Sequence, residues 1–163
     1  MPGFSTSGGW TNFSGQGYQN DVHYAAAGSG AAVASWVFSG LSAGQYRVSA
    51  TWSVDPNRAT NSPFTVYDGA TALQTVAVNQ ELTPSDRTDQ GVGWKDLGTF
   101  TISGSSLKVS LSNLANEYVI ADGIRIERMT AAPVLQLSDG ANPVANGSVV
   151  SFGTTTPGTR NAS

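Results

Sequence analysis

An alternation of apolar and polar residues over positions 45–54 is the most regular feature of the chain. A period of two places successive side chains on opposite faces of an extended strand. This segment is therefore predicted to be a half-buried β-strand whose apolar side chains face a core. The apolar positions are Tyr46, Val48, Ala50, Trp52 and Val54.

Six further segments show the same strand signal, and turns rich in Gly, Ser and Asp separate them. Helix signals are nearly absent, because no window sustains apolar residues at helical spacing. Many short strands without crossover helices predict antiparallel pairing in two packed sheets. The expected fold class is all-β, an antiparallel β-sandwich of jelly-roll-like topology. The six segments are Ala34–Phe38, Phe64–Tyr67, Leu73–Val78, Leu97–Ile102, Leu107–Leu111 and Tyr118–Arg128.

The character of the chain changes after Met129. The Thr-Ala-Ala-Pro segment that follows is typical of a linker and divides the chain into domains at 1–130 and 131–163. Beyond the linker, Leu135–Gly140 and Ser148–Thr159 are predicted to form a two-strand extension, which is too small to close a core alone. Free strand edges pair readily with other chains, so self-association through these strands is one hypothesis.

Charge is sparse for a soluble domain, since 12% of residues are charged, with 8 Lys and Arg against 11 Asp and Glu. The cations are scattered singly, so no basic patch is present and nucleic acid is not expected as a partner. Cysteine is absent, which excludes disulfides and thiolate metal sites. No apolar run is long enough for insertion into a membrane. The abundance of Gly, Ser, Thr and Asn is typical of secreted β-proteins, and an extracellular or cell-surface location is predicted.

Nothing in the sequence favours catalysis. His23 is the only histidine, and no serine in a nucleophile-elbow motif accompanies it, so a Ser-His-Asp triad is not predicted. Carboxylates are few and lie on no recognisable catalytic scaffold, although glycoside hydrolysis needs only two of them across a cleft. We therefore expect that the chain is not an enzyme, and rank hydrolysis below the non-catalytic roles.

Five segments carry a family pattern: Gly44–Trp52, Asn57–Val66, Trp94–Phe100, Val109–Asn113 and Tyr118–Ile126. Together they resemble the golvesin and xanthan-lyase C-terminal domain, a carbohydrate-binding-like module, over residues 8–129. The resemblance implies a β-sandwich appended to secreted bacterial enzymes and surface proteins, with attachment to carbohydrate or surface matrix. Further along, Asp139-Gly140 and Phe152–Thr156 resemble the opening of bacterial immunoglobulin-like repeats. The 131–163 segment is accordingly expected to be a linker and an incomplete repeat of a longer protein.

Asp122 is the most informative acidic residue, because alternation over 118–126 places it on the apolar face of its strand. Burying a carboxylate without a partner costs several kcal/mol, so a partner is expected. Arg58 or backbone N–H groups of the 55–63 loop would supply one. The alternative is a structural calcium with Asp122 as a ligand, as related sandwich modules carry, although no Asp-rich calcium loop is present. No other cofactor is predicted.

Sugar binding requires aromatic and polar side chains together, because a pyranose stacks its apolar face on an aromatic ring while polar groups bond its hydroxyls. Trp36 and Trp52 lie in strand patterns and are predicted core residues, whereas Tyr18 and Tyr24 are possible platforms. The 55–63 loop is the predicted binding loop, although its polar side chains would equally serve to brace it. The candidate sugar-binding residues are Arg58, Thr60, Asn61, Tyr67 and Trp94.

The preferred hypothesis is a non-catalytic extracellular module that binds a polysaccharide or cell-surface glycan on behalf of a larger secreted protein. The alternative is a structural or adhesive domain, a spacer or filament subunit, whose partner is another protein chain. The aromatic residues near loops motivate the first hypothesis, and the incomplete C-terminal strands motivate the second.

Overall fold

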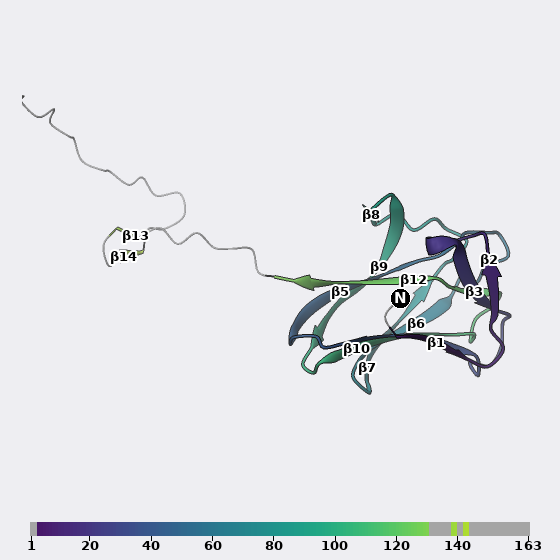
Figure 1. Cartoon of the computed structure of the whole chain (residues 1–163), viewed down its shortest axis with the longest axis horizontal. Helices are drawn as coiled ribbons and strands as arrows, with labels where there is room; N and C mark the ends of the chain where they lie inside the picture. The colour runs from purple at the N-terminus through teal and green to yellow at the C-terminus, as the bar shows by residue number, and fades with distance from the viewer. Residues whose placement is uncertain (1–2, 131–137, 140–141, 144–163) are drawn as a thin grey trace, which may run out of the picture. The chain divides into compact units, whose positions relative to one another are not determined.

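The computed structural model describes residues 3–130, 138–139 and 142–143. The chain divides into two compact units, Met1–Thr130 and Ala131–Ser163. The first unit is an antiparallel β-sandwich (Figure 1). Its one departure from strand and loop is a single 3-10 turn, η1 (Tyr18–Asn20), and the described residues contain no α-helix.

In the second unit, strand β13 (Ser138–Asp139) pairs antiparallel with strand β14 (Asn142–Pro143). The first strand of this pair falls within the predicted Leu135–Gly140 segment. The second predicted strand, 148–159, lies outside the described residues. Self-association through the C-terminal strands therefore stays a prediction.

Twelve strands make up the sandwich, and most are short segments bounded by turns. Their hydrogen-bonded neighbours are antiparallel throughout, apart from one isolated parallel bridge outside the strands. The strands are β1 (Phe4–Ser7), β2 (Thr11–Ser14), β3 (Asp21–Ala25), β4 (Val33–Ser39), β5 (Gly44–Thr51), β6 (Ser62–Asp68), β7 (Thr71–Val78), β8 (Arg87–Asp89), β9 (Val92–Ile102), β10 (Ser106–Ser112), β11 (Val119–Ala121) and β12 (Gly123–Met129).

One layer of the sandwich is a five-stranded sheet of order β1-β4-β10-β6-β7. Val109 in β10 lies directly between Trp36 in β4 and Val66 in β6. Residues directly opposite one another project from the same face of a sheet. Because Trp36 is 1% exposed and the two valines are fully buried, this face is one wall of the core.

The other layer consists of two smaller sheets, of order β12-β5-β9-β8 and β11-β3-β2. Asp122 alone separates β11 from β12, so the chain passes from one sheet into the other at that residue. Val48 and Ala50 of β5, with Phe100 and Ile102 of β9, cover the core from this side. Strands β2 and β3 stand at one end of the sandwich (Figure 1).

A β-bulge in β9 changes which side chains face the core. Asp96 and Gly98 pair with consecutive residues of β5, so Leu97 between them has no partner. Leu97 packs into the core, and Asp96 and Trp94 lie on the outer face of the sheet. Without the extra residue, Trp94 would share the inward face of Phe100.

The predicted all-β sandwich is confirmed, and every segment predicted to be a strand before residue 130 contains one. Trp36 and Trp52, the predicted core residues, are 1% and 6% exposed. Strands β1, β2, β3 and β8 were not predicted. The segment Tyr118–Arg128 is two strands rather than one. The prediction that Val54 faces the core is wrong. Val54 is 45% exposed, because β5 ends at Thr51.

Candidate functional site

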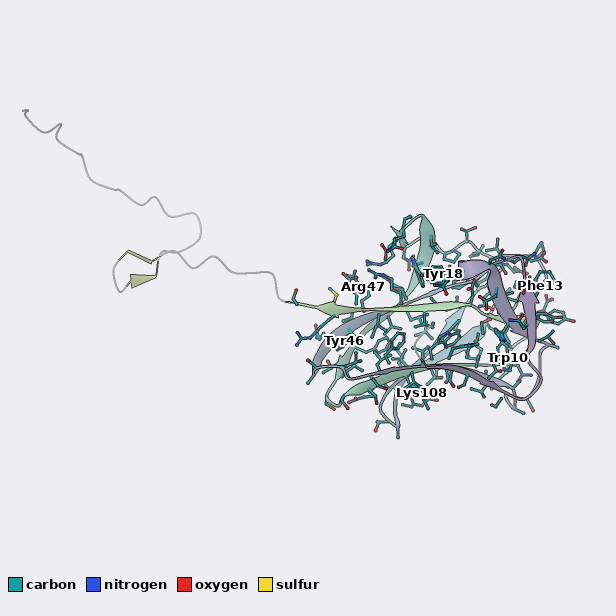
Figure 2. All side chains as sticks on the ribbon, viewed as in Figure 1. Trp10, Phe13, Tyr18, Tyr46, Arg47 and Lys108 are labelled. Atoms are coloured by element: carbon teal, nitrogen blue, oxygen red, sulfur yellow. The ribbon has the colours of Figure 1, made fainter. Side chains whose placement is uncertain are left out.

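One face of the small β11-β3-β2 sheet forms the floor of a groove. Phe13 in β2 lies opposite Val22 in β3, and Ile120 in β11 lies opposite Tyr24 in β3. Opposed residues share a face, so these four side chains form a continuous apolar strip. Val22 and Ile120 are 3% and 0% exposed, whereas Phe13 projects at the outer end of the sandwich (Figure 2).

The 55–63 loop closes another side of this groove. Arg58 forms a parallel bridge with Tyr118, and the Ala59 N–H donates a 2.8 Å hydrogen bond to the Tyr118 carbonyl. The Arg58 guanidinium donates to Asn57 Oδ1 over 2.6 Å, which ties these two polar side chains together. The groove has a volume of about 340 Å³ and is lined by Phe13, Gln16, Val22, Tyr24, Asn57, Arg58, Tyr118 and Ile120.

Tyr118 separates the groove from a second hollow of about 290 Å³, which shares Tyr118 and Asn57 with the first. The Tyr118 side chain is 41% exposed and meets Tyr24 edge on, with the ring centroids 6.0 Å apart. The two hollows therefore adjoin along one exposed aromatic side chain. The remaining residues of the second hollow are Ala26, Ala27 and Glu117.

A buried glutamine supports the groove from behind. Gln80 is fully buried, and its Oε1 accepts 2.8 Å hydrogen bonds from Ser62 Oγ and from the Ile120 N–H. Its Nε2 donates to the Ile120 carbonyl over 2.8 Å, and its backbone N–H donates to the Ala59 carbonyl. These bonds join β11, β6 and the loop of Arg58 into one unit, so the shape of the groove is set in advance of binding.

The five residues predicted to bind sugar do not gather at one place. Arg58 lines the groove. Thr60 and Asn61 instead hold Asn116: the Thr60 hydroxyl accepts from Asn116 Nδ2 over 2.8 Å, and Asn61 Oδ1 accepts from the Asn116 N–H over 2.9 Å. For Asn61 this is the bracing role that the sequence left open.

Tyr67 and Trp94 lie away from the groove. Tyr67 is on the outer face of the five-stranded sheet, where Lys108 Nζ lies 3.9 Å from the centre of its ring. Trp94 is 4% exposed and is covered by Tyr18, with the ring centroids 5.5 Å apart. Neither residue lines the hollows beside Arg58, and their part in binding stays a prediction from the sequence alone.

Two exposed aromatic residues of the groove, Phe13 and Tyr118, were missed among the predicted site residues. Each stands among polar neighbours, with Asn12 and Ser14 around Phe13 and Glu117 before Tyr118. For Phe13, the signal that could have identified it is an aromatic residue among polar neighbours outside any strong alternation; Tyr118 opens the alternating 118–126 segment, and only Glu117 before it signals an exposed position. Tyr24, predicted to be a possible platform, does line the groove.

Asp122 is 4% exposed, and both of its carboxylate oxygens lie 3.0 Å from the Tyr18 N–H that donates to them. The expected partners, Arg58 or the 55–63 backbone, are therefore wrong: the η1 turn of the N-terminal segment folds over this junction instead. Burial raises the pKa of Asp122 to about 7, since it outweighs the Tyr18 hydrogen bond, and the nearby Asp21 adds to the rise.

Two glycines allow this close packing around Asp122. Gly17 has a φ of 79°, and a Cβ there would lie 2.5 Å from an Asp122 carboxylate oxygen. A Cβ at Gly123 would lie 3.2 Å from both the Trp94 and the Tyr18 rings. Tyr18 can therefore reach Asp122 with its N–H and Trp94 with its ring, which links the two sheets of this layer.

Candidate metal ligands do not cluster in the part of the chain that the structure describes. No three His, Cys, Asp or Glu side chains there could together hold a metal ion. Calcium ligation by Asp122 therefore stays a prediction that only the resemblance supports. His23 packs against the Phe4 ring, with centroids 4.9 Å apart. Across the same described residues, no helix has the length and apolar character needed to cross a membrane.

A second polar region covers the outer face of the β12-β5-β9-β8 sheet. Glu127 Oε2 lies 3.1 Å from the Arg125 guanidinium and 3.4 Å from those of Arg47 and Arg87. Arg47 projects from the face of the sandwich opposite to Lys108 (Figure 2). Three arginines from three strands therefore share one carboxylate.

Aspartates complete the charge balance of this region. Asp96 accepts hydrogen bonds from Arg87 over 3.1 Å and from Ser49 Oγ over 2.7 Å. Burial works against the ionised form of Asp96, but these hydrogen bonds prevail and hold its pKa below its ordinary value. Asp89 accepts from Arg125 over 2.9 Å. The region is thus a closed network of ion pairs.

Comparisons with known proteins identify the family of this sandwich. The model of the family described as Golvesin C-terminal domain matches residues 1–128. Among solved structures, a Paenibacillus xanthan lyase is 27% identical, with a TM-score of 0.65 over 78% of this chain and 12% of that chain. A family GH115 4-O-methyl-α-glucuronidase with specificity for decorated arabinogalactans is 16% identical, with a TM-score of 0.48 over 76% and 16%. The search of curated proteins found no match.

This chain therefore spans only a small part of the two solved enzymes to which it is similar. The family model, by contrast, covers nearly all of the sandwich and stops close to the end of β12. The golvesin resemblance carried by the five sequence segments is confirmed, while the immunoglobulin-like resemblance of the 131–163 segment stays a prediction. The chain belongs to the Golvesin C-terminal domain family.

Proposed function

We propose that this chain is a non-catalytic, extracellular module that binds carbohydrate in the groove and so attaches a larger secreted protein to a polysaccharide or cell-surface glycan. The observation that carries this proposal is the pair of exposed aromatic side chains over a buried apolar floor, with Phe13 48% and Tyr118 41% exposed. Large aromatic surfaces left in water beside a hollow are typical of ligand sites. A sugar ring fits them because its C–H face is apolar.

Polar side chains in the same groove suit the hydroxyls of a sugar. Arg58 supplies N–H donors, and the amides of Gln16 and Asn57 supply donors and acceptors. Apart from its two tyrosines, the groove has none of the side chains that usually perform general acid–base catalysis, since its eight lining residues include no Asp, Glu or His. This composition supports binding without bond cleavage.

The comparison with solved structures supports the same role. The similar enzyme of higher TM-score is by name a lyase of xanthan, a polysaccharide, and this chain corresponds to 12% of it. A small domain within a polysaccharide-degrading enzyme is well placed to hold the enzyme on its polymer, which raises the effective concentration of substrate. That task places the module where the polymer is, outside the cell.

Affinity electrophoresis of the purified chain in gels containing xanthan, polygalacturonate, glucuronoxylan or a neutral glucan tests the proposal. We expect retention by at least one polymer, and a loss of affinity of about tenfold or more in Tyr118→Ala and Phe13→Ala. Tyr67→Ala, which removes an aromatic ring from the opposite layer, is the matched control and should bind normally. Thermal unfolding of each variant shows whether the sandwich is intact.

Two results would contradict the proposal. Loss of binding in Tyr67→Ala with normal binding in Tyr118→Ala would move the site to the sequence-predicted residue on the other layer. Absence of retention by every polymer, together with oligomers that grow with protein concentration, would favour the structural or adhesive alternative.

A further inference from the structure

Within the part of the chain that the structure describes, Arg58 differs from the arginines of the outer-face network because no carboxylate pairs with it. Arg47, Arg87 and Arg125 each lie within 3.4 Å of a carboxylate oxygen. Among the described residues, Arg58 forms no ion pair, and its guanidinium donates only to Asn57 Oδ1 over 2.6 Å and to the Ser53 carbonyl over 3.5 Å. Both acceptors are neutral, so the positive charge of Arg58 is left uncompensated at the groove.

Charge is also distributed unevenly on the two sides of Tyr118. Among the described residues, Arg58 is the one charged residue lining the first hollow, and Glu117 is the one charged residue lining the second. A ligand that fills both hollows therefore meets the Arg58 cation in the first and the Glu117 anion in the second. An anionic group on the ligand is attracted to the Arg58 side and repelled from the Glu117 side.

We propose that the groove recognises an acidic polysaccharide, with the carboxylate of a uronic acid or similar sugar on Arg58 and a neutral neighbouring sugar across Tyr118 beside Glu117. This rests on the proposed function, because it names the class of carbohydrate that the groove takes. The planar guanidinium matches a carboxylate in a two-pronged hydrogen bond, which a neutral sugar cannot form. The partial enclosure of the groove strengthens that ion pair relative to one in open water.

The two adjoining hollows also indicate which part of the polymer is bound. The two hollows share Tyr118 and Asn57, so a ligand that fills both is longer than a single sugar and continues past Tyr118. The module is thus suited to internal segments of a chain, and a single acidic sugar fills only the Arg58 side.

Carboxyl reduction supplies the test, because it converts each uronic acid to its neutral sugar and keeps the linkages of the polymer. The 163-residue chain is run against xanthan and glucuronoxylan before and after reduction, since both combine acidic with neutral sugars. We expect reduction to weaken retention about tenfold or more, and Arg58→Gln to weaken retention of the native polymers to a similar degree. On the reduced polymers, the loss caused by Arg58→Gln should be much smaller than on the native ones, because only donation to hydroxyls is then removed.

Arg128→Gln is the matched control, because Arg128 also forms no ion pair among the described residues but donates to the Ala43 carbonyl and lines neither hollow. It should bind like the unaltered chain. Equal retention of native and reduced polymers, or equal losses in Arg58→Gln and Arg128→Gln, would overturn the acidic-sugar assignment and leave the proposed function standing. Normal binding by Tyr118→Ala would instead count against the proposed function itself.

Discussion

Two regions of the sandwich place arginines near aromatic rings. In one region carboxylates pair with the arginines, and in the other no such pairing is present among the described residues. On the outer face of the β12-β5-β9-β8 sheet, Arg47, Arg87 and Arg125 share Glu127 with support from neighbouring aspartates. In the groove, Arg58 meets only neutral acceptors within the described residues. The position of cations along the chain therefore does not locate a binding surface. Whether a carboxylate from another strand reaches each cation decides which of them is free for a ligand.

The aromatic residues of the two regions differ in how far they are exposed to solvent. Trp94 on the outer face is covered by Tyr18 and is 4% exposed, whereas Tyr118 in the groove is 41% exposed. The aromatic ring of the outer face is thus covered by another ring, whereas the aromatic ring of the groove is left exposed. Asp122 lies at the junction of the two regions, because it joins β11 of the groove to β12 of the outer face.

Removing the amide of Gln80 is expected to have the largest effect, because it would break the support of the groove. Gln80→Ala leaves the Ser62 hydroxyl and both backbone polar groups of Ile120 buried without their partners. At roughly 1–3 kcal/mol for each unsatisfied group, we expect a loss of about 5 kcal/mol in the free energy of unfolding. Urea unfolding followed by tryptophan fluorescence measures it.

Gln74→Ala is the matched control, because Gln74 is exposed on β7. It should change the free energy of unfolding by less than about 0.5 kcal/mol. A loss below about 1 kcal/mol in Gln80→Ala would show that the groove does not depend on this buried amide.

The carboxyl group at the junction is expected to make stability depend on pH. Because the pKa of Asp122 rises from 3.8 to about 7 on folding, the folded protein holds this proton more tightly than the unfolded chain does. Its contribution is complete at pH below 3.8, declines as the pH rises, and is lost above about 7. We expect the free energy of unfolding to fall by about 2–4 kcal/mol across this range. Urea unfolding at pH 5, 6, 7 and 8 follows the decline.

Asp122→Asn should abolish this decline and be more stable than the unaltered chain at pH 8, because asparagine stays neutral. Asp21→Asn should keep the decline but shift it to lower pH, since the charge of Asp21 contributes to the raised pKa of Asp122. The lowered pKa values of Asp68, Asp86 and Asp96 place their own effects at more acidic pH. An unchanged decline in Asp122→Asn would assign the pH dependence to another group.

The sequence predicted the central strands because these alternate between core and solvent, as residues 45–52 do. Strand β2 escaped prediction because all four of its residues are exposed, so it has no alternation to detect. The single-residue bulge at Leu97 reversed the face of Trp94, and the neighbouring Gly98, with a φ of 143°, was the sequence signal for it, since a glycine inside a strand often marks a bulge. Local patterns thus predict where a strand lies. Whether one of its side chains faces the core or the solvent depends on the register with the neighbouring strand.

The candidate site was predictable only in part, for a related reason. Arg58 was identified because it lies in a polar loop between two strong strands. Phe13, Tyr24 and Tyr118 come from separate segments, and they meet Arg58 only because the sheet order is β11-β3-β2. Period-two patterns do not encode sheet order. The partner of Asp122 was mispredicted for the same reason, since Tyr18 reaches it from the N-terminal segment.

Neutralising Glu127 is expected to have the smallest effect on stability. The side chains of Arg47, Arg87 and Arg125 are 25–26% exposed and that of Glu127 is 40% exposed, so solvent screens their interactions. Glu127→Gln should therefore lower the free energy of unfolding by less than about 1 kcal/mol, and less still in high salt. Glu81→Gln, outside the network and exposed, should have no measurable effect. A loss above about 2 kcal/mol in urea unfolding would mean that the shared carboxylate supports the sheet itself. The ion pairs of the outer face would then stabilise the fold. The two regions would differ in function as well, because the outer face would contribute to stability and the groove to ligand binding.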